Sequence, residues 1–458
     1  MRITKNAHPK GLYVLFFTEM WERFSFYGMR ALLVLYMTKY LLLEIEKGKT
    51  VVGFETLKTL LEFVYGPLGN QAISSHIYGY YTGLVYLTPF FGGLLADRLI
   101  GQRRSVYIGG FLMAIGHFLM AIESQFFPAL FFLIIGNGFF KPNISSQVGM
   151  LYAENDHRRD EAFTFFYMGI NLGAVLSPLV CGTLGQILGW HWGFGSAGIG
   201  MLIGIAVYHF GKKHLPPDQR ALRELHGNKS LAKETNKTEA TSQDEFRSVL
   251  ALIVLCTLNV LFWAVYEQQG NTMQLWADER TNFNLFGWFD MPTTWFQSFN
   301  PMMIILFAPL LMRFWVWQNA RKKEPNSIAK MGIGTFLLGL GYIVMIVAAI
   351  SIPEGEKGSL FWLIGATFIV TFGELYLSPI GLSLVTKMAP ARMVSMLMGV
   401  WFLSSFLGNT LSGILGSFYE TMGKSNFFTM LVAIAFVSAF LFFILNKPLQ
   451  KLTRKEID

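Results

Sequence analysis

The sequence predicts an all-α membrane protein in which twelve membrane-spanning helices form two bundles of six. Composition is the first observation: 53% of the 458 residues are hydrophobic and 14% are charged, whereas soluble domains average about 25% charged residues. The second is that apolar runs long enough to cross a bilayer recur along the whole chain. The third is one long hydrophilic segment, 212–244, which divides these runs into two sets of six.

Each apolar run is predicted to be one membrane-spanning helix, with ends placed to within a few residues. In chain order the twelve runs are 11–41, 73–98, 104–123, 126–150, 161–188, 193–212, 247–271, 294–318, 328–351, 359–388, 393–421 and 426–446.

The hydrophilic segment sets the predicted domain boundaries. An N-terminal bundle, 1–214, is joined to a C-terminal bundle, 247–458, by a linker, 215–246. The linker is rich in Lys, Glu, Asn and Thr and almost free of aromatic residues, which is typical of a solvated connection. It is too short and too polar to hold further spans. A division into two halves of similar length is typical of transporters that are built from repeated units.

Basic residues predict the orientation of the helices. An even number of spans places both termini on one side, and cytoplasmic loops carry an excess of Lys and Arg. The loops after even-numbered runs are basic, and those after odd-numbered runs are nearly bare or acidic. We therefore predict cytoplasmic termini in a multi-pass plasma-membrane protein, most simply of a bacterial inner membrane. The basic residues concerned are Arg98, Arg103, Arg104, Arg158, Arg159, Arg321, Lys322, Lys323, Lys330 and those from Lys447 to Lys455.

Other segments carry smaller predictions. The N-terminal ten residues lack an apolar stretch with a cleavage site, so the first run is expected to be retained as a helix. The segment 44–71 is expected to extend the first helix or to form a short surface helix. Cys181 and Cys256 lie in apolar runs, which predicts two buried thiols rather than a disulfide or a metal site. Most of the basic residues behind the net charge of +8 lie in the short segments between apolar runs, and we expect no nucleic-acid partner.

The first run carries one stripe of polar and aromatic residues. Each of its four ionisable groups would cost roughly 2.5–3.5 kcal/mol at the bilayer centre, so the stripe is expected to face protein or a water-filled cavity. We interpret it as the wall of a transport pathway. The alternative, an ion pair of Glu19 with Arg23 that only joins helices, explains two of the four charges. At helical offsets 0, 3, 4, 7, 8 and 11 the members are Glu19, Glu22, Arg23, Phe26, Tyr27 and Arg30.

Three further charges recur at a regular helix spacing. Lys141, Glu267 and Glu374 lie in the fourth, seventh and tenth runs. With the first run, these begin successive three-helix units, and equivalent helices of such repeats line one cavity. The seven charges are four carboxylates and three cations, so one added proton would neutralise the set.

The segment Gly92–Arg104 resembles the loop 2–3 signature of the major facilitator superfamily. Its glycines let neighbouring helices approach closely, and Asp97 can pair with arginines such as Arg103 at the cytoplasmic mouth. We expect a gating role for both residues. An ordinary basic loop would explain the arginines but not the Gly/Asp spacing.

The first-run stripe resembles the E-x-x-E-R-F-x-Y-Y-G motif of the proton-coupled oligopeptide transporters, the POT/PTR family. Together with it, further motifs extend the resemblance over the whole chain. They lie at 138–143, 166–173, 262–270, 295–301, 373–379 and 401–405.

Three departures from the family pattern stand out. Phe26 replaces the first tyrosine of the motif, which removes a hydroxyl contact, while Tyr27 remains. Gly79 stands where mammalian members place a histidine, which excludes a histidine proton relay there. The segment 212–244 is too short for the two extra helices that many bacterial relatives insert between the halves.

The resemblance implies a symporter that imports di- and tripeptides with protons by alternating access, binding the peptide in a central cavity between the bundles. A peptide is a zwitterion, so its receptor needs a cationic and an anionic pole. Arginine suits a bidentate grip on a carboxylate, and Glu374 can hold the ammonium group. The cationic pole is then Arg23, Arg30 and Lys141, with Asn171 and Asn300 orienting the peptide backbone. Side-chain pockets would come from Tyr27, Tyr86, Trp295, Trp401 and Phe402, with Ser378 and Ser405 nearby; core packing remains an alternative for each aromatic residue.

Proton coupling is expected to involve Glu19, Glu22, Arg23 and Glu267. A pair of Arg30 with Glu267 would latch the outer mouth, and protonating Glu267 would release it. Which carboxylate carries the proton stays open, because interacting sites titrate as a set. No cofactor is expected, since the proton is a co-substrate.

Three other functions compete with this interpretation. One is a carrier of the same fold for nitrate, a glucoside or a drug-like compound, against which the paired Glu19/Glu22/Arg23 motif and Glu374 favour a zwitterion. An intramembrane enzyme lacks support, since no H-E-x-x-H or G-x-S-x-G motif is present and the eight histidines are scattered. A receptor or a structural membrane protein would not need seven buried charges on equivalent helices. We expect a monomer whose partners are peptides and membrane lipid.

Overall fold

A computed structural model describes residues 7–153, 156, 158–217, 242–285, 287–388 and 393–452, with the backbone alone for 242–246, 382, 386–388, 394, 395 and 452. The predicted linker falls largely on 218–241, which lies outside the described residues.

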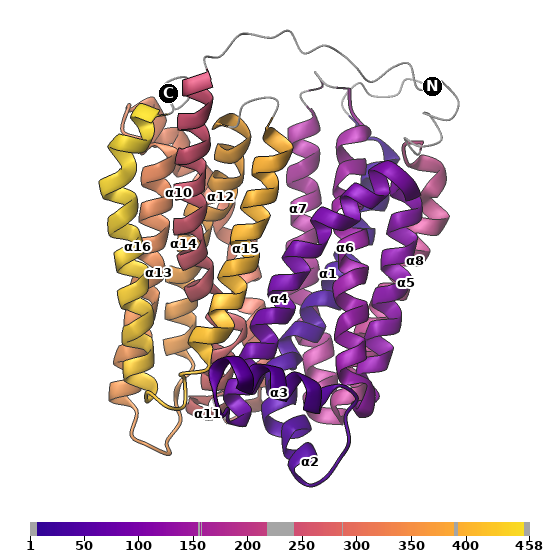
Figure 1. The fold of residues 1–458 in the computed structure, drawn as a ribbon, viewed down its shortest axis with the longest axis vertical. Coiled ribbons are helices and arrows are strands. Elements are labelled where there is room, and N and C mark those ends of the chain that lie inside the picture. Colours follow the sequence, from indigo (N-terminus) through magenta and orange to yellow (C-terminus); the bar gives the residue numbers. More distant parts are fainter. Residues whose placement is uncertain are drawn as a thin grey trace. The chain divides into compact units, whose positions relative to one another are not determined.

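Twelve long α-helices account for most of the described chain (Figure 1). Each overlaps one of the twelve predicted runs, most with ends within a few residues. They are α1 (Lys10–Tyr36), α4 (Asn70–Leu95), α5 (Gln102–Met120), α6 (Phe126–Met150), α7 (Arg158–Ser177), α8 (Trp190–Gly211), α10 (Ser242–Tyr266), α12 (Phe299–Ala320), α13 (Ser327–Ser351), α14 (Phe361–Met388), α15 (Val394–Gly416) and α16 (Lys424–Leu452).

Eleven helical segments among the described residues are long and apolar enough to cross a membrane. The twelfth helix, α5, is shorter and less apolar because it begins with Gln102, Arg103 and Arg104 and contains His117. It nevertheless packs along α6 and α8, both of which qualify as spans. The chain is therefore a multi-pass helical membrane protein.

Shorter elements connect these helices. Helix α1 continues through a π-helical turn, Met37–Leu41, into α2 (Leu42–Glu46), and α3 (Phe54–Tyr65) follows as a separate short helix. Both expectations for 44–71 are thus met. A helix α11 (Thr272–Arg280) follows α10. Two pairs of two-residue strands were not predicted: β1 (Thr281–Asn282) runs parallel to β4 (Gly358–Ser359), and β2 (Asn284–Leu285) antiparallel to β3 (Phe289–Asp290).

The chain forms two compact units. Residues 1–63 and 87–234 make the first, and residues 64–86 and 235–458 the second. In the first unit α1 packs against α7 and α8, and α5 against α6 and α8. In the second unit α13 packs against α14 and α16, and α10 against α15 and α16. The thiols of Cys181 and Cys256 are free and buried, as predicted.

Helix α4 contributes to both units. A Cβ atom on Gly79 would lie 2.6 Å from Gly413 Cα, so the first part of α4 crosses α15 backbone against backbone. Beyond Leu87, a Cβ atom on Gly92 would lie 2.0 Å from the carbonyl oxygen of Gly138 in α6. Only glycine permits either approach, since real Cβ contacts are longer.

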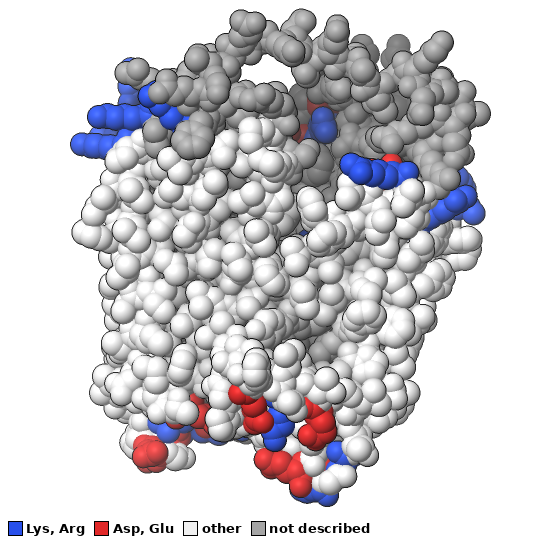
Figure 2. Space-filling model, viewed as in Figure 1, with Lys and Arg blue, Asp and Glu red and all other residues white. Residues whose placement is uncertain are grey.

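Charge is distributed unevenly along each unit. Figure 2 shows mainly Lys and Arg at the upper end, and most of the visible Asp and Glu together with some Lys and Arg at the lower end. This is the pattern that the positive-inside rule associates with cytoplasmic termini.

Candidate functional site

Arg23 is the centre of a buried charge cluster on α1. Its guanidinium contacts Glu22 through Nε and donates from Nη2 to Glu22 Oε1 at 2.9 Å. The same Nε lies 3.0 Å from Glu19 Oε1. All three side chains are buried. Two carboxylates therefore share one arginine, and Glu19 Oε2 is buried without a hydrogen-bond partner among the described residues.

The stripe continues along α1 with less burial. Arg23 lies over the Phe26 ring at 5.3 Å, and Arg30 over the Tyr27 ring at 6.0 Å. Tyr27 and Arg30 are both half-buried, whereas Phe26 is buried. The end of the stripe nearer to Arg30 is thus the more accessible to a solute.

Lys141 in α6 joins the cluster by its charge. It interacts electrostatically with Arg23, Glu22 and Glu19, and its side chain is half-buried. Pro142, the next residue, lies inside α6 and provides no N–H for the helix. The structure therefore brings the predicted residues Glu19, Glu22, Arg23 and Lys141 into one group.

Asn171 lies on α7, which packs tightly on α1. A Cβ atom on Gly173 would lie 2.3 Å from the carbonyl oxygen of Met20 and 3.0 Å from Arg23 Cβ, so this glycine permits the contact. Asn171 is buried and donates from Nδ2 to the carbonyl oxygen of Tyr167 at 3.0 Å. That bond fixes the side chain within its own helix turn.

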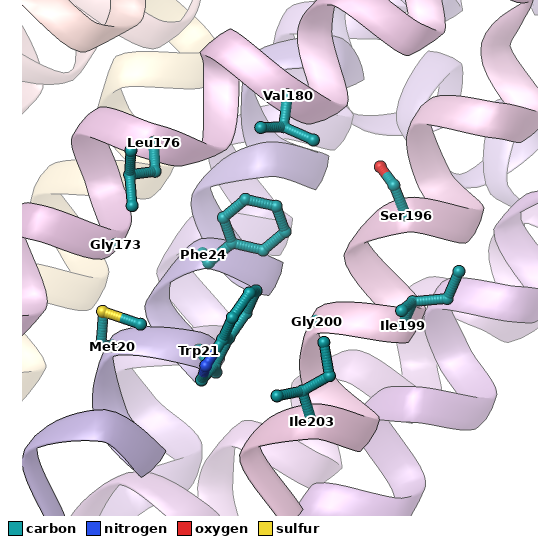
Figure 3. A pocket seen from close by; sticks show the side chains of 10 residues that line it. All are labelled: Met20, Trp21, Phe24, Gly173, Leu176, Val180, Ser196, Ile199, Gly200 and Ile203. Atoms are coloured by element: carbon teal, nitrogen blue, oxygen red, sulfur yellow. The ribbon is translucent and has the colours of Figure 1, made fainter.

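The opposite face of α1 borders an apolar groove of about 280 Å³ (Figure 3). Trp21 and Phe24 of α1 face this space between α7 and α8. The lining contains no charged side chain, and Ser196 donates its hydroxyl to the carbonyl oxygen of Gly193. This groove does not fit a zwitterion, so we separate it from the charged stripe. Its lining is Met20, Trp21, Phe24, Gly173, Leu176, Val180, Ser196, Ile199, Gly200 and Ile203.

The second unit has its own polar centre at Glu374. Glu374 Oε2 accepts a hydrogen bond of 2.6 Å from the Tyr266 hydroxyl and one of 2.9 Å from Asn300 Nδ2. The same Asn300 nitrogen lies 3.0 Å from Thr371 Oγ1. Both Glu374 and Asn300 are half-buried. Three helices, α10, α12 and α14, thus hold one carboxylate in a defined orientation.

Tyr266 and Thr371 are absent from the site predicted from the sequence. Tyr266 directly precedes the charged residue Glu267, and that position in the sequence is the signal that could have identified it as a site residue. Its partner Glu374 lies 108 positions away, and only the packing of α10 near α14 reveals the contact.

Glu267 is buried at the end of α10, in a 3₁₀ turn, Glu267–Gly270. Its Oε2 accepts a hydrogen bond of 3.2 Å from the Tyr78 hydroxyl, from the part of α4 that belongs to the second unit. Tyr78 is a third residue that is absent from the site predicted from the sequence. Arg30, the predicted partner of Glu267, lies in the first unit.

The remaining predicted residues lie on several elements. Trp401 is buried against Gly381, where a Cβ atom would meet the indole at 2.2 Å, and Ser404 and Ser405 both donate to its carbonyl oxygen. Ser405 is therefore turned toward its own helix. Tyr86, Trp295, Ser378 and Phe402 are half-buried.

Arg103 lies at the start of α5. It donates from Nη2 to the carbonyl oxygens of Leu215 at 2.8 Å and Pro216 at 2.6 Å. Asp97 is exposed in the π-helical turn Ala96–Ile100. Arg103 thus links α5 by hydrogen bonds to the segment that follows α8.

Within the described ranges, no group of three or more His, Cys, Asp or Glu side chains is placed to hold a metal ion. The chemistry of both polar centres is that of ion pairing and hydrogen bonding.

Comparison with protein families gives a match to the model PTR2, described as the POT family, over residues 103–231 and 220–431. The chain belongs to the POT family. The family predicted from the motifs is thereby confirmed.

Curated relatives of this POT-family chain match over most of its length. The di-/tripeptide transporter of Lactococcus lactis subsp. cremoris is 34% identical, covering 87% of this chain and 87% of its own. The peptide transporter YePEPT of Yersinia enterocolitica is 35% identical, covering 88% and 86%. The uncharacterised transporter YclF of Bacillus subtilis is 35% identical, covering 87% and 86%. The chain is accordingly a transporter rather than an enzyme.

Solved POT structures share its fold. A peptide transporter POT in complex with sulfate is 34% identical with a TM-score of 0.82, covering 98% of this chain and 96% of that one. A POT family transporter in complex with a thioalcohol conjugated peptide is 31% identical with a TM-score of 0.80, covering 97% and 98%. The predicted major facilitator fold is confirmed.

Proposed function

We propose that this POT-family chain is a symporter that imports di- and tripeptides together with protons by alternating access. The relatives from Lactococcus lactis and Yersinia enterocolitica are named di-/tripeptide and peptide transporters, and a solved relative carries a peptide conjugate. The observation that carries the proposal is the pre-oriented carboxylate of Glu374, held by Tyr266 and Asn300.

Glu374 is suited to the ammonium end of a peptide. Its two hydrogen-bonding neighbours fix the carboxylate before substrate arrives, so little side-chain entropy is lost on binding. An ammonium group supplies three donors to a carboxylate acceptor, which makes a charge-assisted bond stronger than a neutral one. Asn300, bonded to the same oxygen, then lies beside the peptide's first amide.

The first unit supplies cations for the carboxylate end. Lys141 and Arg30 are half-buried, whereas Arg23 is buried and held by two carboxylates. Arg23 is therefore a ligand for the peptide only when Glu19 or Glu22 releases it. Protonating either carboxylate removes its ion pair and frees the guanidinium, which couples proton uptake to peptide binding.

Glu19 is the proton acceptor that the geometry favours. Both oxygens of Glu22 contact Arg23, while Glu19 Oε2 has no partner among the described residues. A proton on that oxygen disrupts no hydrogen bond that the structure records. Glu267, which accepts from Tyr78, serves as the second coupling carboxylate and the gating one, with Arg30, Asp97 and Arg103 as further gating residues.

Uptake into proteoliposomes tests the proposal. Labelled dialanine should accumulate with an inward proton gradient, equilibrate without one and lose accumulation when a protonophore is added. Excess unlabelled tripeptide should compete, while nitrate and a glucoside should not. Competition by nitrate or the glucoside alone would favour a carrier of the same fold for another solute.

A further inference from the structure

Helix α3 has three distinct faces. Phe54 and Leu61 are buried and form the face that packs on the protein. Glu55 and Thr59, one turn apart, are exposed and form a polar face. Leu60, Phe63 and Val64 fall on one further stripe and are 60%, 86% and 59% exposed. Apart from the exposed Thr56, one turn before Leu60, this last stripe is apolar, and the protein leaves it uncovered.

The beginning of α3 is fixed near the first turn of α6. Val52 donates its backbone N–H to the carbonyl oxygen of Ser124 at 3.0 Å, and the Phe54 ring stacks on Phe127 at 6.0 Å. Phe127 is the second residue of α6, which spans the membrane. This end of α3 therefore lies at the level where a spanning helix begins.

The end of α3 is fixed near the first turns of α4. Four residues separate Tyr65 from Asn70, where α4 begins. The Tyr65 ring stacks on His76 at 4.2 Å, and the hydroxyls of Tyr65 and Tyr80 lie 2.8 Å apart. In Figure 1 α3 runs crosswise to the spanning helices at their lower ends.

Lipid adjoins the surface on which α3 begins. Phe131, one turn beyond Phe127 on the same face of α6, is 62% exposed on a spanning helix, where the bilayer is its surroundings. The charged residues of α3, Glu55, Lys58 and Glu62, carry one net negative charge. Attraction to anionic lipid therefore cannot hold this helix at the membrane, whereas apolar insertion can.

We propose that α3 is an interfacial helix on the membrane surface opposite the N-terminus, with Leu60, Phe63 and Val64 inserted at the boundary between lipid headgroups and acyl chains. Insertion transfers the apolar side chains of this stripe from water into lipid, while Glu55 and Thr59 stay hydrated on the other exposed face. The partner is the bilayer itself, and binding does not depend on anionic headgroups.

Spin labels on single cysteines test the insertion. Cysteines replace Leu60, Phe63 and Val64 in one set and Glu55 and Thr59 in a matched control set, all at exposed positions of the same helix. The native thiols of Cys181 and Cys256 are buried, which limits background labelling. The full-length protein is reconstituted in vesicles of phosphatidylcholine, and collision of each label with dissolved oxygen and with a water-soluble nickel chelate is measured.

Labels at 60, 63 and 64 should collide several-fold more with oxygen than with nickel, and labels at 55 and 59 should show the reverse. Adding phosphatidylglycerol should leave the pattern unchanged. Equal nickel access at all five positions would overturn the proposal. Spectral broadening at 63 that disappears on dilution with unlabelled protein would also overturn it, because a second copy of the chain would then cover the stripe.

Discussion

The hydroxyl of Tyr266 lies 2.6 Å from Glu374 Oε2, joining α10 to α14 through a hydrogen bond to a carboxylate. The Tyr266 phenol is neutral, so removing its hydroxyl tests the orientation of the Glu374 carboxylate without changing the charge of the site. Hydrogen bonds to charged groups contribute about 1.5–3 kcal/mol.

Replacing Tyr266 by Phe should weaken binding of free dipeptides about tenfold, because Glu374 loses a hydrogen bond that orients it. Calorimetric titration of purified protein measures the affinity. Tyr342→Phe is the matched control, since Tyr342 donates to the backbone of Val265 and lies outside the Glu374 group. A similar loss in both variants would point to a general packing defect.

Glu374→Gln should weaken binding of free dipeptides more than binding of N-acetylated dipeptides. The acetylated compounds lack the ammonium charge, so only the free peptides lose an ion pair. Competition with labelled dialanine measures both series. Equal losses would contradict the assignment of Glu374 to the peptide's N-terminus.

Glu19→Gln and Glu267→Gln should each abolish proton-driven accumulation while preserving exchange of substrate down its own gradient. Glutamine mimics the protonated carboxyl, so the protein no longer senses the proton gradient. Paired counterflow and gradient-driven uptake measure the two activities. If both are lost together with a lower melting temperature, the loss of a buried carboxylate has destabilised the protein instead.

Gly79→Val should lower the melting temperature, because a side chain there meets the backbone of Gly413. Overpacking of this kind costs roughly 1–3 kcal/mol. Gly195→Val is the control, since nothing lies within 4 Å of a Cβ atom at Gly195 in α8. Thermal unfolding in detergent compares the two, and an unchanged melting temperature for Gly79→Val would contradict the tight crossing.

Orientation is tested by labelling single cysteines with an impermeant maleimide. A cysteine at Lys322, exposed between α12 and α13, should be protected in intact cells, and one at Glu354, exposed after α13, should react. The reverse pattern would place both termini outside.

The helices were predictable because bilayer thickness imposes a length on each apolar run, and the exact match of 126–150 with α6 illustrates this. The grouping of Glu19, Glu22 and Arg23 was also predictable, since helical spacing alone places them on one stripe. Both inferences use information local to a single segment.

Contacts between segments that lie far apart in the chain could not be predicted from the sequence. Tyr78 reaches Glu267 across 189 positions, and no local pattern distinguishes this tyrosine from its neighbours Tyr80 and Tyr81. The short strands β1 and β4 also pair across a long gap, from Thr281 to Gly358. Such partners are set by how helices pack, which periodicity within one helix does not encode.

Helix α4 belongs to the second unit up to Tyr86 and to the first from Leu87 onward. Along its length α4 therefore has close backbone contacts with two different helices, with α15 at Gly79 and with α6 at Gly92. Pro89 lies inside α4 three residues beyond the division, and its missing N–H removes one of the bonds that resist bending. A helix bends most easily where such a bond is missing, so we expect that stiffening α4 by Pro89→Ala slows transport without changing peptide affinity.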